Sequence, residues 1–265
     1  MKRIHFFEFE DQPWFPRFLR NYLTDFLQHA ANAFDAYDQL IPIVEKGLAA
    51  SGGSRIIDLA SGGGGGLLRL AERLRTRVSD LQITLTDYYP NVPAFERTAG
   101  LSDVFSFRSE SVNALDVPEE LTGLRTQFLS FHHFRPEEGQ QILQNAVDRG
   151  APILVVELQD RSLLSIFGVL LSPLTVLLMT PMIRPFRWGR LFFTYLLPLV
   201  PFFVCFDGVV SCLRTYSSRE MKELIAGLEG AEEYRWQVGA LRKGPAKVSY
   251  TLGLPAAENH SSTSS

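Results

Sequence analysis

The sequence predicts an α/β fold with a seven-stranded, mostly parallel sheet that ends in a β-hairpin. Short apolar runs alternate with helical patterns, a glycine-rich turn links the first run to a helix, and only residues 241–246 separate the last two runs. Strands that alternate with helices favour a parallel sheet covered on both faces. A short connection between strands favours a hairpin at the sheet edge. The predicted strands are 55–59, 82–86, 104–108, 125–130, 153–157, 234–240 and 247–252.

The first 50 residues predict a helical cap. Residues 16–30 place apolar side chains at helical spacing, and a second helical pattern, 34–49, ends before a glycine turn. Trp14 and Phe15 either close over a ligand as a lid or staple the first helix to the core. We therefore divide the chain into an N-terminal helical cap (1–50), a ligand-binding core (51–160), a hydrophobic insertion (161–214), the C-terminal part of the core (215–254) and a disordered tail (255–265).

The most specific motif joins the first strand to its helix. Asp58 ends the strand, Ser61 follows, and Gly62–Gly66 are five consecutive glycines. A strand, a tight glycine loop and a helix bring backbone N–H groups close to a nucleotide-like ligand with no Cβ in the way. Nicotinamide, flavin and other nucleotide enzymes share this pattern. The turn alone therefore predicts only the class of ligand.

Polar and aromatic residues also follow the next two strands. Asp87 ends the strand 82–86, where a carboxylate can accept both hydroxyls of a ribose. Tyr88 or Tyr89 can offer a flat face to an adenine ring, and Asn113, after the third strand, can hydrogen-bond its edge. Asp87 can equally cap a helix or form a turn, and Asn113 can be a turn residue.

The hydrophobic insertion follows the fifth strand. Ser162–Ile183 contains no charged residue and is long enough for a membrane span, whereas Leu191–Phe206 is short for one. The segment between them, RPFRWGR at 184–190, carries three arginines and a tryptophan. An in-plane or re-entrant membrane hairpin with Arg and Trp at the headgroup level fits this pattern. The alternative is a buried lid over an active site. Asp207, beside apolar residues, is expected to pair with Arg214 because a buried lone carboxylate is costly.

Composition limits the partners. The chain has 265 residues, of which 46% are hydrophobic, and its net charge of -3 gives no reason to expect nucleic acid. Cys205 and Cys212 lie in apolar surroundings, which favours a reducing compartment. We expect the protein in the cytoplasm or at the cytoplasmic face of the membrane. With no Cys/His/carboxylate group at ligand spacing along the chain, we expect no metal site.

The order of these motifs resembles the class I S-adenosylmethionine-dependent methyltransferases, which have a Rossmann-like fold. Residues 58–64, DLASGGG, match their D-x-G-x-G-x-G motif with Ala60 in place of the first glycine. Asp87 falls at the ribose-binding acid, and Asn113 falls where the family often has an Asp beside the adenine. Residues 127–134, QFLSFHHF, resemble the fourth-strand motif beside the methyl donor. The similarity covers residues 54–254 apart from the insertion.

Similarity is closer still to bacterial methyltransferase-like proteins that carry TDxYPN, SFHHFRP and DGVVSxLRxY segments. The resemblance implies S-adenosylmethionine as the cofactor and methylation of an oxygen, nitrogen or carbon atom of a small acceptor. The insertion suggests that this acceptor is lipid-like and reached from the membrane surface. The residues expected to bind the cofactor are Asp58, Ala60, Ser61, Gly62, Gly64, Asp87, Tyr88, Asn113 and Ser130.

His132 and His133, just past the fourth strand, are the candidate catalytic residues. A histidine there can act as a general base toward a protonated nucleophile. Alternatively, one of them caps the next helix or packs in the core, since Phe131 and Phe134 flank the pair.

Two other functions remain as rivals. A nicotinamide-dependent reductase would need a second nucleotide-binding half, and no later strand is followed by a glycine-rich turn. A non-catalytic, membrane-associated protein that binds S-adenosylmethionine or serves as a scaffold is the second rival, because fold alone does not determine function.

Overall fold

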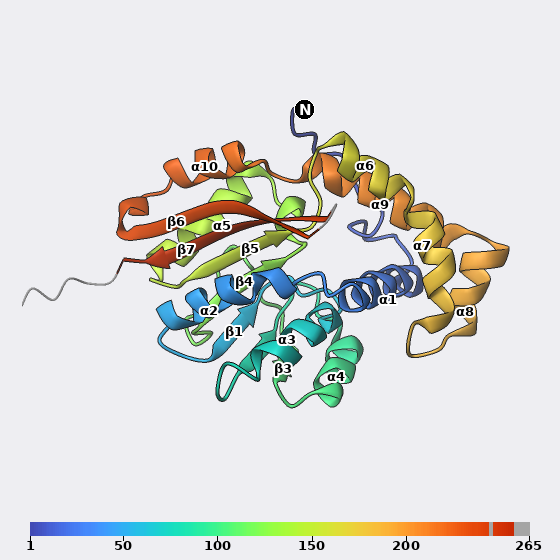
Figure 1. Ribbon diagram of the computed structural model, residues 1–265, viewed down its shortest axis with the longest axis horizontal. Helices are drawn as coiled ribbons and strands as arrows, with labels where there is room; N and C mark the ends of the chain where they lie inside the picture. The colour runs from blue at the N-terminus through green and yellow to red at the C-terminus, as the bar shows by residue number, and fades with distance from the viewer. Residues whose placement is uncertain (244–245, 257–265) are drawn as a thin grey trace, which may run out of the picture.

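One seven-stranded sheet organises the chain. The structure is a computed structural model that describes residues 1–243 and 246–256. The strand order is β3-β2-β1-β4-β5-β7-β6 (Figure 1). Strands β1 to β5 pair in parallel, and β7 is antiparallel to both β5 and β6. The predicted fold class, a mostly parallel sheet with a closing hairpin, is therefore confirmed. The strands are β1 (Arg55–Asp58), β2 (Gln82–Leu85), β3 (Phe105–Phe107), β4 (Leu124–Phe128), β5 (Ile153–Glu157), β6 (Tyr234–Lys243) and β7 (Ala246–Pro255).

Helices cover both faces of the sheet. Neighbouring residues of a strand point to opposite faces, and Ile56 and Ile57 of β1 accordingly belong to two separate apolar clusters. The Ile56 cluster includes side chains of α2, α3 and α4, and the Ile57 cluster includes side chains of α5 and α10. These helices are α2 (Ile41–Ala50), α3 (Leu68–Leu74), α4 (Val92–Leu101), α5 (Pro136–Asp148) and α10 (Ser218–Ala226).

The first helix and the hydrophobic insertion pack together beyond the end of the sheet (Figure 1). Their shared cluster joins Leu23 of α1 to Val176 of α7 and Val200 of α9. The helices are α1 (Arg17–Ala33), α6 (Leu163–Leu170), α7 (Ser172–Met179), α8 (Trp188–Leu191) and α9 (Leu199–Arg214). Short helical turns complete the chain: η1 (Asp38–Leu40), η2 (Gly65–Leu67), η3 (Phe131–His133), η4 (Thr180–Met182), η5 (Phe192–Leu196) and η6 (Ala231–Glu233).

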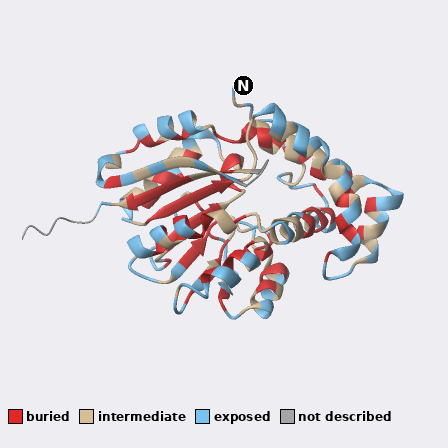
Figure 2. Cartoon of the chain, viewed as in Figure 1, coloured by how far each residue is buried: buried red, intermediate tan, exposed pale blue. Residues whose placement is uncertain are grey.

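The insertion keeps much of its apolar surface outside. Figure 2 shows α6 and α7 largely in the colours of intermediate and exposed residues, and α6, which is described in full, has no buried residue. Among the described residues, one helix of 20 residues, Leu163–Met182, is long and apolar enough to cross a membrane. The segments Trp188–Leu196 and Leu199–Arg214 pass the same test together, but a bend of 76° separates them.

One arginine of the insertion departs from the expected headgroup position. Arg190 is only 1% exposed, and its Nη1 atom lies 2.7 Å from Asp25 Oδ2 of α1. Its Nη2 atom donates to the carbonyl oxygens of Ile183 and Pro185. Breaking a buried pair by removing one partner typically costs about 3–5 kcal/mol. This ion pair therefore fastens the insertion to α1, and Arg184 remains as an exposed arginine of the segment.

Two of the predicted boundaries lie elsewhere in the structure. The helix expected over 34–49 forms only from Asp38 onward, as η1 and then α2. Asp35 has a φ of 48°, a left-handed conformation that a right-handed helix cannot contain. Pro255, expected in a disordered tail, belongs to β7. The rest of that prediction falls, from residue 257 on, outside the described residues.

Candidate functional site

The loop after β1 is built on a buried carboxylate. Asp58 is 2% exposed, and Thr126 Oγ1 of β4 donates a hydrogen bond of 2.8 Å to its Oδ1 atom. Burial raises the pKa of Asp58 to about 7, against the hydrogen bonds that favour its charged form. Ser61 Oγ closes the turn by donating to the Asp58 carbonyl oxygen at 2.8 Å. Asp58 and Ser61 therefore hold the backbone of the loop in place through hydrogen bonds on its buried side.

The loop depends on left-handed backbone at three positions. The φ angles are 53° at Ala60, 57° at Gly62 and 72° at Gly64. A Cβ at Gly64 would also lie 2.4 Å from Leu85 Cδ1, whereas a Cβ at Gly62 would have no heavy atom within 4 Å. Left-handed backbone costs a residue with a side chain roughly 1–2 kcal/mol. Gly62 is thus the glycine that leaves space above the loop, and Gly64 is required by packing.

Two other glycines of the run receive the first helix. A Cβ at Gly63 would lie 1.8 Å from Gln28 Nε2, and one at Gly65 would lie 2.6 Å from Gln28 Oε1. Asn32 Nδ2 donates to the Gly65 carbonyl oxygen at 2.7 Å, and Asn32 Oδ1 accepts from the Arg69 backbone at 2.9 Å. Part of the glycine run therefore serves helix packing, a use that the sequence motif did not reveal.

Asp87 connects the glycine loop with the end of β2. Its Oδ2 atom accepts from the Gly62 backbone N–H at 2.9 Å, and its Oδ1 atom accepts from the Tyr89 N–H at 2.8 Å. Burial raises the pKa of Asp87, while the charge of His133 opposes that shift. Tyr88 beside it is 52% exposed. The structure thus brings Asp87, Gly62 and Tyr88 together at one edge of the sheet.

Asn113 and Ser130 lie on the loops after β3 and β4. Asn113 is exposed, and its Oδ1 atom accepts from the Leu115 backbone N–H at 3.0 Å, which is the turn-forming alternative. The preceding residue, Val112, donates its N–H to the Asp87 carbonyl oxygen, so this loop reaches the Asp87 loop. The Ser130 hydroxyl is buried and has no hydrogen-bond partner among the described residues.

His132 is held by a carboxylate at the end of β5. Its Nδ1 atom lies 3.0 Å from both carboxylate oxygens of Glu157, and its backbone N–H also donates to Glu157 Oε1. Gln159 Nε2 donates to Glu157 Oε2 at 3.0 Å. His132 is only 3% exposed. These contacts fix the orientation of the imidazole and leave its Nε2 atom pointing away from Glu157.

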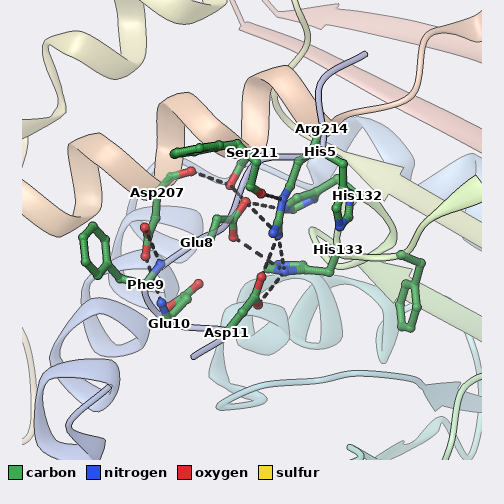
Figure 3. A network of polar contacts seen from close by, with 12 residues as sticks. His5, Glu8, Phe9, Glu10, Asp11, His132, His133, Asp207, Ser211 and Arg214 are labelled. Carbon is green, nitrogen blue, oxygen red and sulfur yellow. Dashed lines mark hydrogen bonds and ion pairs between the residues drawn. The ribbon is translucent and has the colours of Figure 1, made fainter. Parts of the chain in front are cut away.

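The segment 1–16, here called the N-terminal strap, contacts His133. Asp11 Oδ1 lies 2.9 Å and Glu8 Oε2 3.5 Å from His133 Nδ1. Arg214 Nη1 of α9 lies 2.7 Å from Asp11 Oδ2 and 3.3 Å from Glu8 Oε1 (Figure 3). Burial lowers the pKa of His133, but the two carboxylates outweigh that effect and raise it to about 10.

The expected pair between Asp207 and Arg214 is wrong. Asp207 accepts hydrogen bonds from the backbone N–H groups of Phe9, at 2.8 Å, and Glu10, at 3.2 Å (Figure 3). On one α-helix, residues seven positions apart can share a face, but the N-terminal strap supplies closer partners to both side chains. Trp14 and Phe15 are the two residues suggested as a lid or a staple. Phe15 is 3% exposed and packs in the apolar cluster that α1 shares with the insertion, whereas Trp14 is 66% exposed.

Comparisons with known proteins reveal likenesses only among solved structures. No protein-family model and no curated protein matches the chain. The chain is similar to an O-methyltransferase family protein from Burkholderia thailandensis at 15% identity and a TM-score of 0.47, covering 84% of this chain and 57% of that one. Human N-acetylserotonin methyltransferase in complex with S-adenosylmethionine is 16% identical with a TM-score of 0.47, and the match covers 89% of this chain and 56% of that one. Magnesium protoporphyrin IX methyltransferase from Synechocystis PCC 6803 is 11% identical with a TM-score of 0.43, and the match covers 83% of this chain and 84% of that one.

The chain spans about half the length of several of these structures. The strand order and the closing antiparallel hairpin give the chain a Rossmann-like, seven-stranded α/β fold. This fold places the loops after β1, β2, β3 and β4 at one edge of the sheet, where ligands of parallel α/β sheets bind.

The residues at this edge fit S-adenosylmethionine. Gly62 leaves open space beside the Asp87 carboxylate, and the buried Ser130 hydroxyl has no hydrogen-bond partner in the part of the chain that the structure describes. Asp87 can accept from ribose hydroxyls, and Ser130 can donate to or accept from the cofactor. Ala60, which stands where the family motif has a glycine, has a left-handed φ of 53°. All of the predicted cofactor contacts, those of Asp87, Gly62 and Ser130 included, stay predictions.

Sequence reasoning missed the carboxylates around the histidines. Glu8, Asp11 and Glu157 stand in three distant parts of the chain, and only the fold brings them to η3. Glu157 had a readable signal, because it ends a buried strand as Asp58 does. Glu8 and Asp11 had none beyond an acidic start to the chain.

Proposed function

We propose that this protein transfers a methyl group from S-adenosylmethionine to an oxygen, nitrogen or carbon atom of a small, lipophilic acceptor. The observation that carries the proposal is the Asp87 carboxylate at the end of β2, 2.9 Å from the backbone nitrogen of Gly62. A carboxylate beside an open glycine turn suits a ribose next to a backbone that a ligand can approach. Asp87, Gly62 and Ser130 are the residues that would hold the cofactor.

The proposed chemistry makes few demands on the protein. S-adenosylmethionine supplies a methyl group bonded to a sulfonium sulfur. The nucleophile attacks this methyl group in line with the sulfur, and the rate depends mainly on how the two reactants are positioned. A proton must leave when the nucleophile arrives protonated. Glu157 holds His132 Nδ1, which keeps His132 Nε2 as the atom able to accept that proton. His133 is the second candidate, but Glu8 and Asp11 raise its pKa to about 10, so it already carries a proton near neutral pH and suits the role less well than His132.

The lipophilic character of the acceptor rests on the insertion. Its outward side chains include Leu163, Leu174, Leu178 and Trp188, exposed by 79%, 58%, 73% and 78%. Large contiguous apolar surfaces are uncommon on soluble monomers and mark interaction sites. The 162–183 segment has no charged residue, and an exposed arginine and tryptophan follow it. This composition suits a lipid surface, with Arg184 and Trp188 near the headgroups.

Docking in the plane of the membrane accounts for the packing better than spanning does. Val176 of α7 is fully buried against α1 and α9, and Met179 is 8% exposed. The Arg190–Asp25 ion pair also holds the insertion against α1. A helix with one face on the protein and the other outside can lie along a bilayer with its apolar face inserted. The absence of buried residues in α6 speaks against the buried-lid alternative.

A flotation experiment tests the membrane contact. Leu178→Asp places a charge on the outward face of α7, and Leu101→Asp is the matched control on α4, since the two leucines are 73% and 72% exposed. A charged residue inside a bilayer costs about 2.5–3.5 kcal/mol on insertion scales. Leu178→Asp should therefore abolish flotation with phospholipid vesicles, while Leu101→Asp floats like the wild type. Equal flotation of all three proteins would contradict membrane docking.

The activity is tested with labelled S-adenosylmethionine and a membrane lipid extract. We expect label in an extractable lipophilic product and formation of S-adenosylhomocysteine. Cofactor binding without any labelled product would favour the alternative of a non-catalytic, membrane-associated S-adenosylmethionine-binding or scaffold protein. Binding of NAD in its place would favour a reductase. A heat-treated sample of the same protein provides the blank.

A further inference from the structure

Two hydrogen-bond acceptors, a nitrogen of His132 and a carboxylate oxygen of Glu8, face each other where the N-terminal strap meets η3. Because His132 Nδ1 lies 3.0 Å from both oxygens of Glu157, the ring proton belongs on Nδ1 and the lone pair on Nε2. That Nε2 atom lies 3.9 Å from Glu8 Oε1. The side chains of His132 and Glu8 are 3% and 1% exposed. Buried lone pairs that point at each other are unfavourable unless a proton, a water molecule or a cation lies between them.

His133 and Asp11 extend this arrangement. His133 Nδ1 lies 3.5 Å from Glu8 Oε2 and 2.9 Å from Asp11 Oδ1. Glu8 Oε2 is buried and has no hydrogen-bond partner among the described residues. One ligand atom each from Glu8, His132 and His133 lie within 4.8 Å of one another. Figure 3 shows Glu8, Asp11 and His133 gathered around the guanidinium group of Arg214.

We propose that Glu8, His132 and His133 bind a divalent transition-metal ion, Zn²⁺ in the first instance, with Asp11 as a fourth ligand. Zinc bound by nitrogen and oxygen at about 2.0–2.2 Å in a tetrahedron sets its ligand atoms roughly 3.4 Å apart. The separations of 2.9, 3.5 and 3.9 Å bracket that value. Shifts of a few tenths of an ångström would complete the site. Two imidazoles with carboxylates are a ligand set that suits such ions.

The neighbours of these four residues also suit a metal. Glu157 contacts the Nδ1 of His132, the carboxylate–histidine arrangement that orients metal-binding imidazoles. Arg214 Nη1 lies 2.7 Å from Asp11 Oδ2 and 3.3 Å from both Glu8 Oε1 and His133 Nδ1, so a bound ion would require this guanidinium to withdraw from His133. Once His133 has lost its proton, the three carboxylates of Glu8, Asp11 and Glu157 against the one guanidinium of Arg214 leave two negative charges, which a divalent ion neutralises.

A bound ion would fasten the N-terminal strap to η3. Glu8 and Asp11 come from the strap, and His132 and His133 come from η3. Metal binding requires both imidazoles to be neutral, so it displaces a proton from His133. Neither histidine can then act as a base, so the base role proposed for His132 belongs to the metal-free protein. The metal site does not rest on the proposed methyl transfer, and the experiment below does not use that activity.

Zinc binding to the tag-free, full-length protein tests the site. Titration against a competing chelator should give one zinc ion per chain. Glu8→Gln and His132→Ala should each lower the affinity on the order of 100-fold, and Glu157→Gln should lower it roughly 10- to 100-fold. His29→Ala, a substitution on α1, is the matched control and should leave the affinity unchanged. Circular dichroism and thermal unfolding of each variant without metal establish that it folds.

Cobalt substitution identifies the ligand atoms. Co²⁺ in the proposed site should give the visible bands of a nitrogen and oxygen environment, and those bands should vanish in Glu8→Gln. A thiolate charge-transfer band would assign the ion to Cys205 or Cys212 and overturn the proposal. Wild-type protein without stoichiometric zinc, or a folded Glu8→Gln variant with wild-type affinity, would overturn it as well.

Discussion

Replacing Asp87 with asparagine should weaken cofactor binding without unfolding the protein. Each carboxylate oxygen of Asp87 accepts one backbone N–H group, from Gly62 and from Tyr89, and keeps a second lone pair for a ribose hydroxyl. Asp87→Asn preserves the size of the side chain but retains only one acceptor oxygen. Its amide N–H₂ group would face the Gly62 N–H or the Tyr89 N–H.

The expected loss follows from one charge-assisted hydrogen bond. Hydrogen bonds to charged groups contribute about 1.5–3 kcal/mol. The Kd for S-adenosylhomocysteine should therefore rise roughly 10- to 200-fold in Asp87→Asn. Asp80→Asn is the matched control, because Asp80 is exposed and precedes β2, at the opposite edge of the sheet. Its left-handed φ of 55° is one that asparagine also tolerates.

Calorimetric titration measures both variants, and an analogue of S-adenosylhomocysteine without ribose hydroxyls isolates the contact. The analogue should bind wild-type protein more weakly than the parent compound but lose little further affinity in Asp87→Asn, because both changes remove the same interaction. Additive losses would show that Asp87 acts elsewhere. An unchanged Kd in a folded Asp87→Asn protein would refute the assignment of Asp87 to the ribose.

Two further predictions concern the loop and the polar cluster. Gly64→Ala should lower the free energy of unfolding by about 2–5 kcal/mol, because the new side chain is strained in the left-handed backbone and overpacks against Leu85. Gly66→Ala, the control, should change the free energy of unfolding by less than about 1 kcal/mol. Urea denaturation measures both variants, and equal stabilities would contradict the loop geometry. His133 has a pKa raised to about 10 in the folded protein, so its ion pairs should stabilise the protein fully below about pH 6.5 and lose that effect as the pH rises through 10. The difference in unfolding free energy between wild type and His133→Asn should shrink over that range, and a difference independent of pH would argue against a charged His133.

The sheet could be predicted from the sequence because its signals are local. Each strand is a short apolar run, and the strand Ile153–Glu157 matches its predicted bounds. The glycine turn and Asp87 were readable for the same reason, since each stands directly after a strand. Parallel strands bring their carboxyl ends to one edge, so the topology places the glycine turn and Asp87 at the same edge of the sheet.

The polar cluster could not be predicted because its parts come from distant segments. Glu8, His133 and Arg214 meet only when the N-terminal strap lies against η3 and α9. Arg190 illustrates the same limit within the insertion. Its neighbours in sequence suggested a membrane headgroup position, whereas the fold supplies Asp25 from α1 as a buried partner.

Titration of the wild-type protein with S-adenosylmethionine tests the central claim most directly. We expect heat from a single site with a Kd on the order of 1–100 μM, in the usual range for enzyme ligands, and no heat from NAD. The absence of binding to S-adenosylmethionine by folded protein, or binding of NAD at the same site, would contradict the assignment of the glycine turn and Asp87 to this cofactor.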